Sequence, residues 1–286
     1  MPAQIIDGKA VAKNLRAKIK NKVSKIKEKG IVPGLAVVLV GEDPASQIYV
    51  NNKAKACQEC GIKSEVLKIP ATTAEEELLQ VIERLNNCQD IHGILVQLPL
   101  PRQIRARVII EAINPLKDVD GLHPINQGKL FAGNPALIPC TPYGCLKLIE
   151  STGCTLPGKK TVIIGRSNLV GKPMAALLLK ENATITVCHS YTQNLAEITR
   201  TADILIVAVG KPGLVTGEMI KPGALVLDVG MNRLSTGKLT GDVDFPSAIK
   251  IAGWLTPVPG GVGPLTITML LENTLEAVYE QENIFD

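Results

Sequence analysis

The chain has 286 residues, of which 45% are hydrophobic and 20% are charged, with 31 basic and 27 acidic side chains. A chain of this length is expected to form two globular domains, and its balanced charge and 3% aromatic content argue against nucleic-acid binding. The irregularly spaced cysteines, the lack of a long apolar run and the lack of a targeting pattern predict a cytoplasmic protein that neither spans a membrane nor depends on disulfides.

The first half of the chain alternates helix and strand patterns, as expected for an α/β domain. An apolar stripe along residues 9–29 predicts a helix, and the continuous apolar run at 35–40 is typical of a buried parallel strand. Asp43-Pro44 predicts the start of a second helix, which Gly61 would end. The remaining elements are expected to be strands at 64–69 and 93–98 and helices at 74–87 and 102–113.

Tyr49 and Lys53 lie four residues apart in that second helix, so they share one helix face near the carboxyl end of the preceding strand. A lysine in an apolar cleft has a destabilised charged form and can exchange a proton, and a tyrosine ring can stack on a planar ligand. The plainer alternative is a surface lysine beside a half-buried tyrosine. Short-chain dehydrogenases also carry a Tyr-x-x-x-Lys pair, but theirs follows the glycine-rich nucleotide turn, whereas this pair precedes it.

The strand expected at 93–98 ends in a polar amide followed by prolines. Gln97 at this position could orient Lys53, or it could be an ordinary strand-end residue. Residues 114–141 are rich in proline and glycine and lack periodicity, which predicts a functional loop or a crossing between domains. Asp120 lies in this stretch, where the alternative is an Asp-Gly turn; the spacing of its acidic residues does not fit a calcium loop.

A second α/β unit begins after a linker helix expected at 143–150. Strand 161–164 runs into a turn that starts at Gly165 and reaches Gly171 at the start of a helix, an arrangement that binds nucleotide phosphates in doubly wound folds. The alternative is a tight strand-to-helix connection without a ligand. Further strands are expected at 184–188, 204–209 and 224–229.

The end of strand 184–188 predicts which dinucleotide binds. NAD-binding folds usually carry an acid at this point, which bonds the ribose hydroxyl groups. Here the position holds Ser190, and the turn contributes Arg166 and Ser167, so a ribose phosphate would meet hydroxyls and a cation in place of a carboxylate. These residues favour NADP over NAD.

Near the end of the chain, residues 256–264 (TPVPGGVGP) are typical of backbone shaped around a ligand, and an apolar helix to about Tyr279 is expected after them. No metal site is expected. Cys57 and Cys60 form a single isolated pair at a helix end, where ordinary packing is the better interpretation, and the histidines are scattered.

Seven stretches of the chain, in this order, resemble the bifunctional methylenetetrahydrofolate dehydrogenase and methenyltetrahydrofolate cyclohydrolase family: SQIYVNNK, GILVQLPLP, KDVDG, PCTPYG, GRSNLVGKP, GDVDF and TPVPGGVGP. The resemblance implies an enzyme of one-carbon metabolism that supplies purine biosynthesis. Such an enzyme oxidises methylenetetrahydrofolate with NADP and then hydrolyses the methenyl product to formyltetrahydrofolate. The alternatives are another two-domain NADP dehydrogenase, for example for shikimate-like or amino-acid substrates, or a non-catalytic nucleotide sensor.

The resemblance also implies a role for each residue of the site. Lys53 would be the general acid and base of the hydrolysis, Gln97 would hold it, Tyr49 would stack on the folate, and Asp120 would bond the amide and amino edge of the pterin. The other residues expected in the site are Val96, Leu98, Pro259, Gly260, Gly261 and Val262 on the substrate side, and Gly165, Arg166, Ser167, Gly171, Ser190 and Met231 on the cofactor side.

For the fold, the resemblance implies two α/β domains flanking a cleft. Residues 1–140 would form a folate-binding catalytic domain, rejoined by a C-terminal helix at 264–286, and residues 141–263 would form a Rossmann-type, doubly wound NADP-binding domain. The family is usually a homodimer joined through its nucleotide domains, so the same assembly is expected here.

Overall fold

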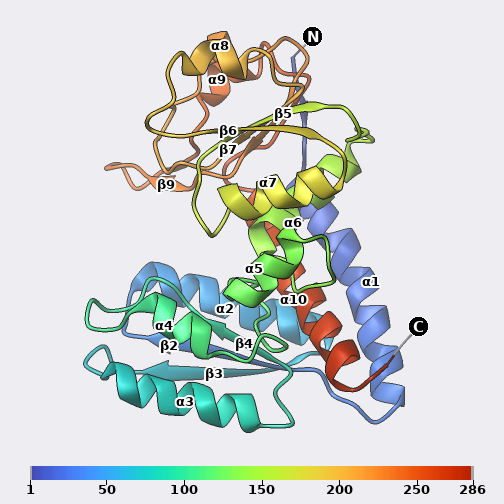
Figure 1. Ribbon diagram of the computed structural model, residues 1–286, viewed down its shortest axis with the longest axis vertical. Coiled ribbons are helices and arrows are strands. Elements are labelled where there is room, and N and C mark those ends of the chain that lie inside the picture. The colour runs from blue at the N-terminus through green and yellow to red at the C-terminus, as the bar shows by residue number, and fades with distance from the viewer. Residues whose placement is uncertain (1, 285–286) are drawn as a thin grey trace. The chain divides into compact units, whose positions relative to one another are not determined.

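The computed structural model describes residues 2–284 and divides into two compact units (Figure 1). Unit 1 combines the chain up to Lys13 with Thr141–Thr266, and unit 2 combines Asn14–Cys140 with the chain from Ile267 onward. The sequence prediction placed residues 1–13 in the other domain. They belong to unit 1 because strand β1 (Gln4–Ile5) pairs in parallel with β11 (Trp254–Leu255) at the edge of its sheet.

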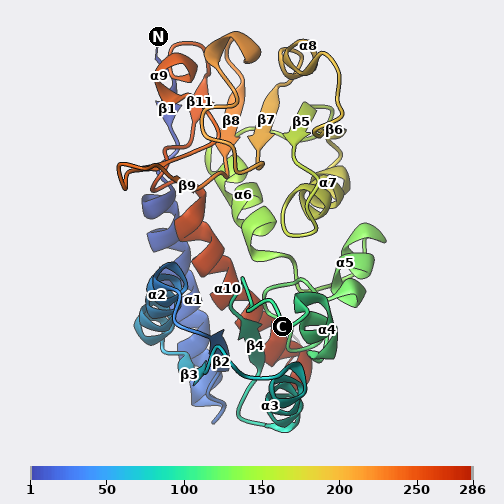
Figure 2. The ribbon, with the colours of Figure 1, turned by 90° about the vertical axis from the view of Figure 1, so that its left-hand side faces the viewer.

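Unit 2 is built on a three-stranded parallel sheet in the order β3 (Lys63–Ile69), β2 (Gly34–Val40), β4 (Gly93–Val96). Strand β2 is buried along its whole length, as its uninterrupted apolar sequence requires for a central parallel strand. Helix α2 (Pro44–Cys60) covers one face, and α3 (Glu75–Asn87) and α4 (Ala106–Ala112) cover the other (Figure 2). On the α3 and α4 face, Ala36 and Val38 of β2 pack against buried side chains that include Leu78, Ile82 and Ile109.

Unit 1 is built on a six-stranded parallel sheet in the order β1-β11-β8-β7-β5-β6, which Figure 2 shows side by side. The chain runs from β5 (Lys160–Ile164) to β6 (Thr184–Cys188) on one side and then to β7 (Ile204–Val207) on the other, so the strand order reverses at β5. This is a doubly wound fold, and its ligands bind at the carboxyl ends of the strands beside such a reversal. The predicted α/β class, with a Rossmann-type second domain, is confirmed.

The remaining elements of unit 1 flank this sheet. They are α6 (Cys140–Ser151), α7 (Gly171–Lys180), α8 (Leu195–Thr199), the 3-10 turn η1 (Gly217–Met219), the antiparallel pair β9 (Asn232–Arg233) and β10 (Leu239–Thr240), and α9 (Phe245–Ala248); strand β8 (Leu225–Asp228) lies within the sheet itself.

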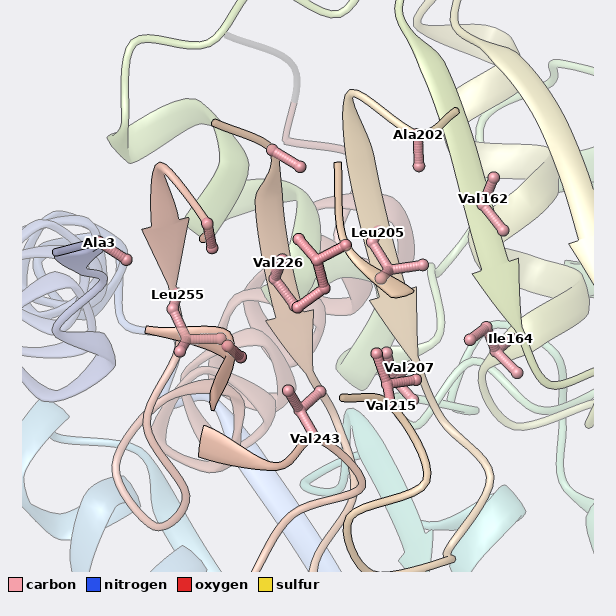
Figure 3. Packing of buried hydrophobic residues seen from close by; sticks show 14 of the residues in the cluster. Ala3, Val162, Ile164, Ala202, Leu205, Val207, Val215, Val226, Val243 and Leu255 are labelled. Carbon is pink, nitrogen blue, oxygen red and sulfur yellow. The ribbon is translucent and has the colours of Figure 1, made fainter. Parts of the chain in front are cut away.

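One apolar cluster supports the sheet of unit 1 (Figure 3). Val162, Leu205 and Val226 come from three neighbouring strands and are 2%, 0% and 0% exposed, and Val215 and Val243 join them from the connections between strands. Burial of each such side chain contributes roughly 1.5–3 kcal/mol. The cluster therefore holds the strand ends, and the loops that follow them, in fixed positions.

Several elements differ from the sequence prediction, and three helices show the physical reasons or the extent. The stretch expected to be loop contains helix α5 (Pro124–Phe131), which starts where the His123 Nδ1 accepts a hydrogen bond from the Ile125 amide at 3.1 Å. Helix α4 begins at Ala106 instead of residue 102. Helix α10 (Val262–Gln281) begins before Pro264, because a helix tolerates proline in its first turn, where the missing amide has no partner to lose.

Helix α10 and helix α1 (Gly8–Glu28) each contribute residues to both units. Across residues 2–284, none of the helices combines the length and the apolar character that crossing a membrane requires.

Candidate active site

Helix α2 presents Tyr49 and Lys53 one turn apart on the same face. Its start is fixed by Asp43, whose carboxylate accepts a hydrogen bond from the Ser46 amide at 2.8 Å, and by a proline in the first turn. Tyr49 is 39% exposed, so part of its ring is accessible to a planar ligand. Lys53 is half-buried.

Lys53 and Gln97 are in direct contact. Lys53 Nζ donates a hydrogen bond of 2.9 Å to Gln97 Oε1. Gln97 follows β4, and its backbone amide donates to the Val38 carbonyl at 2.9 Å, which extends the sheet ladder by one residue. Its side-chain Nε2 donates to the Leu98 carbonyl at 2.6 Å, so the amide is oriented with its oxygen toward the lysine. Val96, the neighbour expected to contact substrate, is only 6% exposed.

Asp120 belongs to the same group of side chains, because both Asp120 and Lys53 lie close enough to the Cys140 thiol to affect its pKa. Burial raises the pKa of the Cys140 thiol well above its ordinary value; the nearby charge and hydrogen bond of Asp120 raise it further, and the charge of Lys53 lowers it. The structure therefore brings Lys53, Gln97 and Asp120 together in unit 2. With such a pKa the Cys140 thiol remains protonated and is a poor nucleophile.

Asp118 organises the loop that carries Asp120. It is 1% exposed and accepts hydrogen bonds from the Leu122 amide at 3.2 Å, the His123 amide at 2.8 Å and the Asn126 side-chain amide at 2.9 Å. Burial, with a smaller contribution from the charge of Asp120, raises the pKa of the Asp118 carboxyl to about 7. Of the two aspartates in KDVDG, one thus supports the loop from inside and the other is half-buried in the site.

Asn273 fixes this loop from helix α10. Its Nδ2 donates to the Val119 carbonyl at 2.8 Å and to the Ile138 carbonyl at 2.7 Å, and it is 2% exposed. Asn273 therefore joins the segment that contains Asp120 to the segment that leads to Cys140. Sequence analysis missed this residue; the available signal was an asparagine in the middle of a largely apolar helix.

The glycine turn of unit 1 has the geometry of a phosphate-binding turn. Gly165 has φ +122°, and a Cβ added there would lie 2.3 Å from the Ala208 carbonyl oxygen. A Cβ added at Gly171 would lie 2.1 Å from the Gly165 carbonyl oxygen, so helix α7 can begin this close to the strand only with glycine. Ser167 Oγ accepts a hydrogen bond from the Val170 amide at 3.1 Å, which stabilises the turn. The first turn of α7 is thereby held at the carboxyl end of β5.

Arg166 and the segment after β6 lie side by side. The Arg166 guanidinium carbon is 5.6 Å from the centre of the Tyr191 ring, a cation–π contact. The Tyr191 amide donates to His189 Nδ1 at 3.2 Å, so Ser190 lies in a short turn next to the ring that carries the arginine. The contact brings a cation and a hydroxyl-bearing residue to the same edge of the sheet. No acidic residue occupies positions 189–192.

The remaining predicted residues also belong to unit 1. Met231 follows β8, is 40% exposed and lies against the start of α10, where a Cβ added at Gly263 would be 3.5 Å from its terminal methyl carbon. The expected substrate segment Pro259–Val262 follows β11; Pro259 is exposed and Gly260 has φ +109°. A Cβ added at Gly8 would lie 1.8 Å from the Gly261 carbonyl oxygen, so the N-terminal end of α1 packs directly on this segment.

Comparison with known proteins decides the family. The model of the tetrahydrofolate dehydrogenase/cyclohydrolase catalytic domain matches residues 6–120, and the model of the NAD(P)-binding domain of the same family matches residues 139–282. The chain belongs to the tetrahydrofolate dehydrogenase/cyclohydrolase family.

Individual members of the family match over nearly the whole chain. The bifunctional protein FolD of Moorella thermoacetica is 60% identical over 97% of this chain and 99% of its own. The crystal structure of the bifunctional FolD of Campylobacter jejuni has a TM-score of 0.96 at 50% identity, covering 98% of this chain and 99% of that one. The Trypanosoma brucei methylenetetrahydrofolate dehydrogenase-cyclohydrolase, solved with NADP and an inhibitor, has a TM-score of 0.94 at 41% identity, and each chain is covered completely.

Several polar groups of this tetrahydrofolate dehydrogenase/cyclohydrolase family member serve the fold. His123 caps α5, and its Nε2 contacts the Glu111 carbonyl at 3.2 Å, so both ring nitrogens are occupied. Cys57 and Cys60 are buried, unbridged thiols, and burial raises the pKa of Cys57 to about 12. Within residues 2–284, no group of three or more His, Cys, Asp or Glu side chains is arranged to hold a metal ion.

Proposed function

We propose that this chain oxidises 5,10-methylenetetrahydrofolate to the 5,10-methenyl compound with NADP, and then hydrolyses that product to 10-formyltetrahydrofolate. The family match over both domains supports this pair of activities. The observation that carries the assignment of residues is the contact between Lys53 and Gln97 beside Asp120. The match does not fit either alternative, a dehydrogenase for shikimate-like or amino-acid substrates or a non-catalytic nucleotide sensor.

The carboxyl edge of the unit 1 sheet fits NADP. The tight approach of Gly165 and Gly171 brings the first turn of α7 against the carboxyl end of β5, and a helix start in this position suits a pyrophosphate. Arg166 and Ser190 supply a cation and a hydroxyl for the ribose phosphate, and Met231 provides apolar surface. When bound, NADP supplies the acceptor for the hydride that leaves the methylene carbon. The chain itself contributes binding and orientation to this half of the reaction.

The side chains of unit 2 fit the folate. Asp120 can accept hydrogen bonds from the amide and amino groups of the pterin edge, which are donors. Tyr49 offers a ring face to the planar pterin and aminobenzoyl groups. Leu98 directly follows Gln97 in the chain and is half-buried, as Gln97 is. Val96, being buried, would contact the folate mainly through its backbone. Of the segment Pro259–Val262 after β11, Pro259 is exposed, Gly260 is half-buried and Gly261 and Val262 are buried, so Pro259 and Gly260 are the members of this predicted substrate segment that a ligand can reach most readily.

Lys53 is the group that we assign to proton transfer in the hydrolytic half. Water adds to the methenyl carbon, which carries the positive charge, and the adduct loses a proton before a carbon–nitrogen bond opens. Lys53 can take up a proton at Nζ during the attack and return one to the departing nitrogen. Gln97 Oε1 holds Nζ at 2.9 Å, which limits the lysine to one position relative to the substrate.

Edge strand β6 is a candidate for the dimer contact expected of the family. It has a neighbour on one side only, and both of its faces are largely exposed, including the apolar Val187 at 38%. An uncovered edge strand is prone to pair with another chain. Light scattering on the purified protein, with Val187→Lys as the comparison, tests this assembly: a monomeric wild type would contradict it.

The decisive test of the function is a single assay with two readouts. Purified protein is mixed with methylenetetrahydrofolate and NADP, and the absorbance of reduced nicotinamide is followed together with the absorbance of the methenyl compound. We expect both to rise and the methenyl signal then to decay faster than in buffer. Well-folded protein that reduces no NADP would refute the dehydrogenase assignment, and decay at the buffer rate would refute the hydrolase assignment.

A further inference from the structure

Two carboxylates without a cationic partner are buried in unit 1. Asp228 ends β8 and is 4% exposed, and Asp242 lies in the GDVDF stretch and is 0% exposed. Within residues 2–284, no Lys, Arg or His forms an ion pair with either of them. Burying a charge without such a partner costs free energy unless hydrogen bonds compensate it. The hydrogen-bond donors around each carboxylate therefore show which segments of the chain that carboxylate holds in place.

Asp242 joins the segments that follow two neighbouring strands. Its Oδ2 accepts hydrogen bonds from the backbone amides of Val209 at 2.7 Å and Gly210 at 2.9 Å, the residues just after β7. Its Oδ1 accepts a hydrogen bond of 2.9 Å from the side-chain amide of Asn232, the first residue of β9, which follows β8 along the chain. Since β7 and β8 are adjacent and parallel, both segments lie at the carboxyl edge of the sheet, where the cofactor residues lie.

Asp228 holds Asp242 in position. Its Oδ1 accepts from the Asp242 amide at 2.9 Å and the Gly230 amide at 3.0 Å, and its Oδ2 accepts from the Val243 amide at 2.9 Å. Val243 anchors the same segment in the apolar cluster (Figure 3). A Cβ added at Gly230 would lie 2.3 Å from Asp242 Oδ1, and one added at Gly241 would lie 1.8 Å from Asp228 Oδ2. The two carboxylates therefore fit only because both positions are glycine.

The segment that Asp242 holds also contacts the glycine turn. Ala208, directly before Val209, donates its amide to the Ile164 carbonyl at 2.9 Å. Its own carbonyl oxygen occupies the space where a Cβ on Gly165 would lie, at 2.3 Å. A shift of residues 208–210 would therefore be transmitted to the turn that begins at Gly165, and a shift of Asn232 would be transmitted to its neighbour Met231.

We propose that Asp242, oriented by Asp228, is a positioning residue for NADP. It holds the segments after β7 and β8 in the arrangement that the cofactor requires, and it touches neither the cofactor nor the reacting atoms. The inference rests on the proposed function, because it presumes that NADP binds at this edge of the sheet.

The test compares cofactor binding with a reaction that needs no cofactor. For Asp242→Ala we expect the Kd of NADP, measured by titration calorimetry, and the KM for NADP to rise about tenfold or more, because three hydrogen bonds to a charged acceptor are lost. The kcat at saturating NADP is expected to fall less than the KM rises. Hydrolysis of methenyltetrahydrofolate, measured without NADP, is expected to stay close to wild type, since Lys53 and Gln97, which we assign to proton transfer, lie in unit 2.

Asp242→Asn covers the case in which the alanine variant does not fold. Its carbonyl oxygen can still accept from Val209 and Gly210, and Asn232 can rotate its amide to accept from the new donor, so we expect a smaller rise in Kd, of about threefold. The matched control is Asp244→Asn in the same GDVDF stretch. The Asp244 side chain makes no capping hydrogen bond to α9, which it precedes, so NADP binding should be unchanged.

Each remaining outcome counts against the proposal. Wild-type affinity and KM in folded Asp242→Ala or Asp242→Asn, with only a lower melting temperature, would mean that Asp242 serves stability alone. Equal loss of hydrolysis would mean that the substitution disturbs the whole chain. If the wild-type chain itself neither binds nor reduces NADP, the proposed function fails, and the positioning role fails with it. That result can be told apart from failure of the positioning role alone, because it is measured on the wild-type chain.

Discussion

Replacing Gln97 by Met tests how much of the hydrolysis depends on the position of Lys53. The substitution keeps the length of the side chain and removes the oxygen that accepts the 2.9 Å hydrogen bond from Lys53 Nζ. A hydrogen bond with one charged partner contributes about 1.5–3 kcal/mol, which corresponds to a loss of about 10- to 150-fold if the bond is fully used in the transition state. The lysine would remain present but would no longer be confined to one position.

The assay follows the decay of methenyltetrahydrofolate absorbance at saturating substrate, corrected for decay in buffer. NADP affinity serves as the folding control, because Gln97 and the cofactor residues belong to different units. Gln97→Glu keeps an acceptor at the same position but adds a carboxylate that stabilises the charged form of Lys53, so it should not recover the rate. The double variant with Lys53→Met should be no slower than Lys53→Met alone, since the amide acts through the lysine. Independent, multiplying losses in the two single variants would refute this reasoning.

Four further outcomes are expected. Arg166→Ala should reduce the preference for NADP over NAD in kcat/KM by about tenfold or more, as expected for loss of a phosphate contact; an unchanged ratio would exclude the arginine from phosphate recognition. Gly171→Ala should abolish NADP binding, measured by calorimetry, because its Cβ would lie 2.1 Å from a carbonyl oxygen. Asn273→Ala should lower stability by about 1–3 kcal/mol in urea unfolding, since it removes the amide that donates to the Val119 and Ile138 carbonyls. The pKa of Asp118 in the folded protein, about 7, lies above its value in the unfolded chain. Asp118 therefore stabilises the folded protein at low pH, and this contribution is lost as pH rises from about 4 to 7. The wild-type melting temperature should fall over this range by more than that of Asp118→Asn, which has no carboxyl group to titrate at this position.

Much of the fold followed from local patterns in the sequence. The apolar run of β2, the Asp43-Pro44 start of α2 and the strand that runs into Gly165 each depend on neighbouring residues, and each was placed within a residue or two. Helix α5 was missed because a histidine side chain caps it, a signal that is weaker than serine or aspartate. The pairing of β1 with β11 joins residues some 250 positions apart, and a two-residue strand carries no periodicity from which to predict it.

For the site, contact between Lys53 and Gln97 could be anticipated because both follow or flank the carboxyl ends of adjacent strands. The supporting residues could not be anticipated. Asn273 is more than 130 positions from each carbonyl to which it donates a hydrogen bond. Asp118 and Asp120 differ in role because Asp118 is buried, and the sequence KDVDG does not show which of the two faces inward. Contacts of this kind are decided by tertiary packing, which the local sequence does not encode.

The interleaving of the two units has a consequence for synthesis on the ribosome. Unit 1 takes β1 from residues 4–5 and its last residues from the segment ending at Thr266, and unit 2 lacks most of α10 until the residues after Thr266 have been made. A nascent chain would therefore carry an unpaired β1 until β11 emerges and an uncovered apolar face until α10 emerges, although domains usually fold as they emerge. Neither unit can be obtained by expressing one contiguous stretch, and a stop codon in the part of α10 that precedes Asn273 would leave unit 2 without that residue.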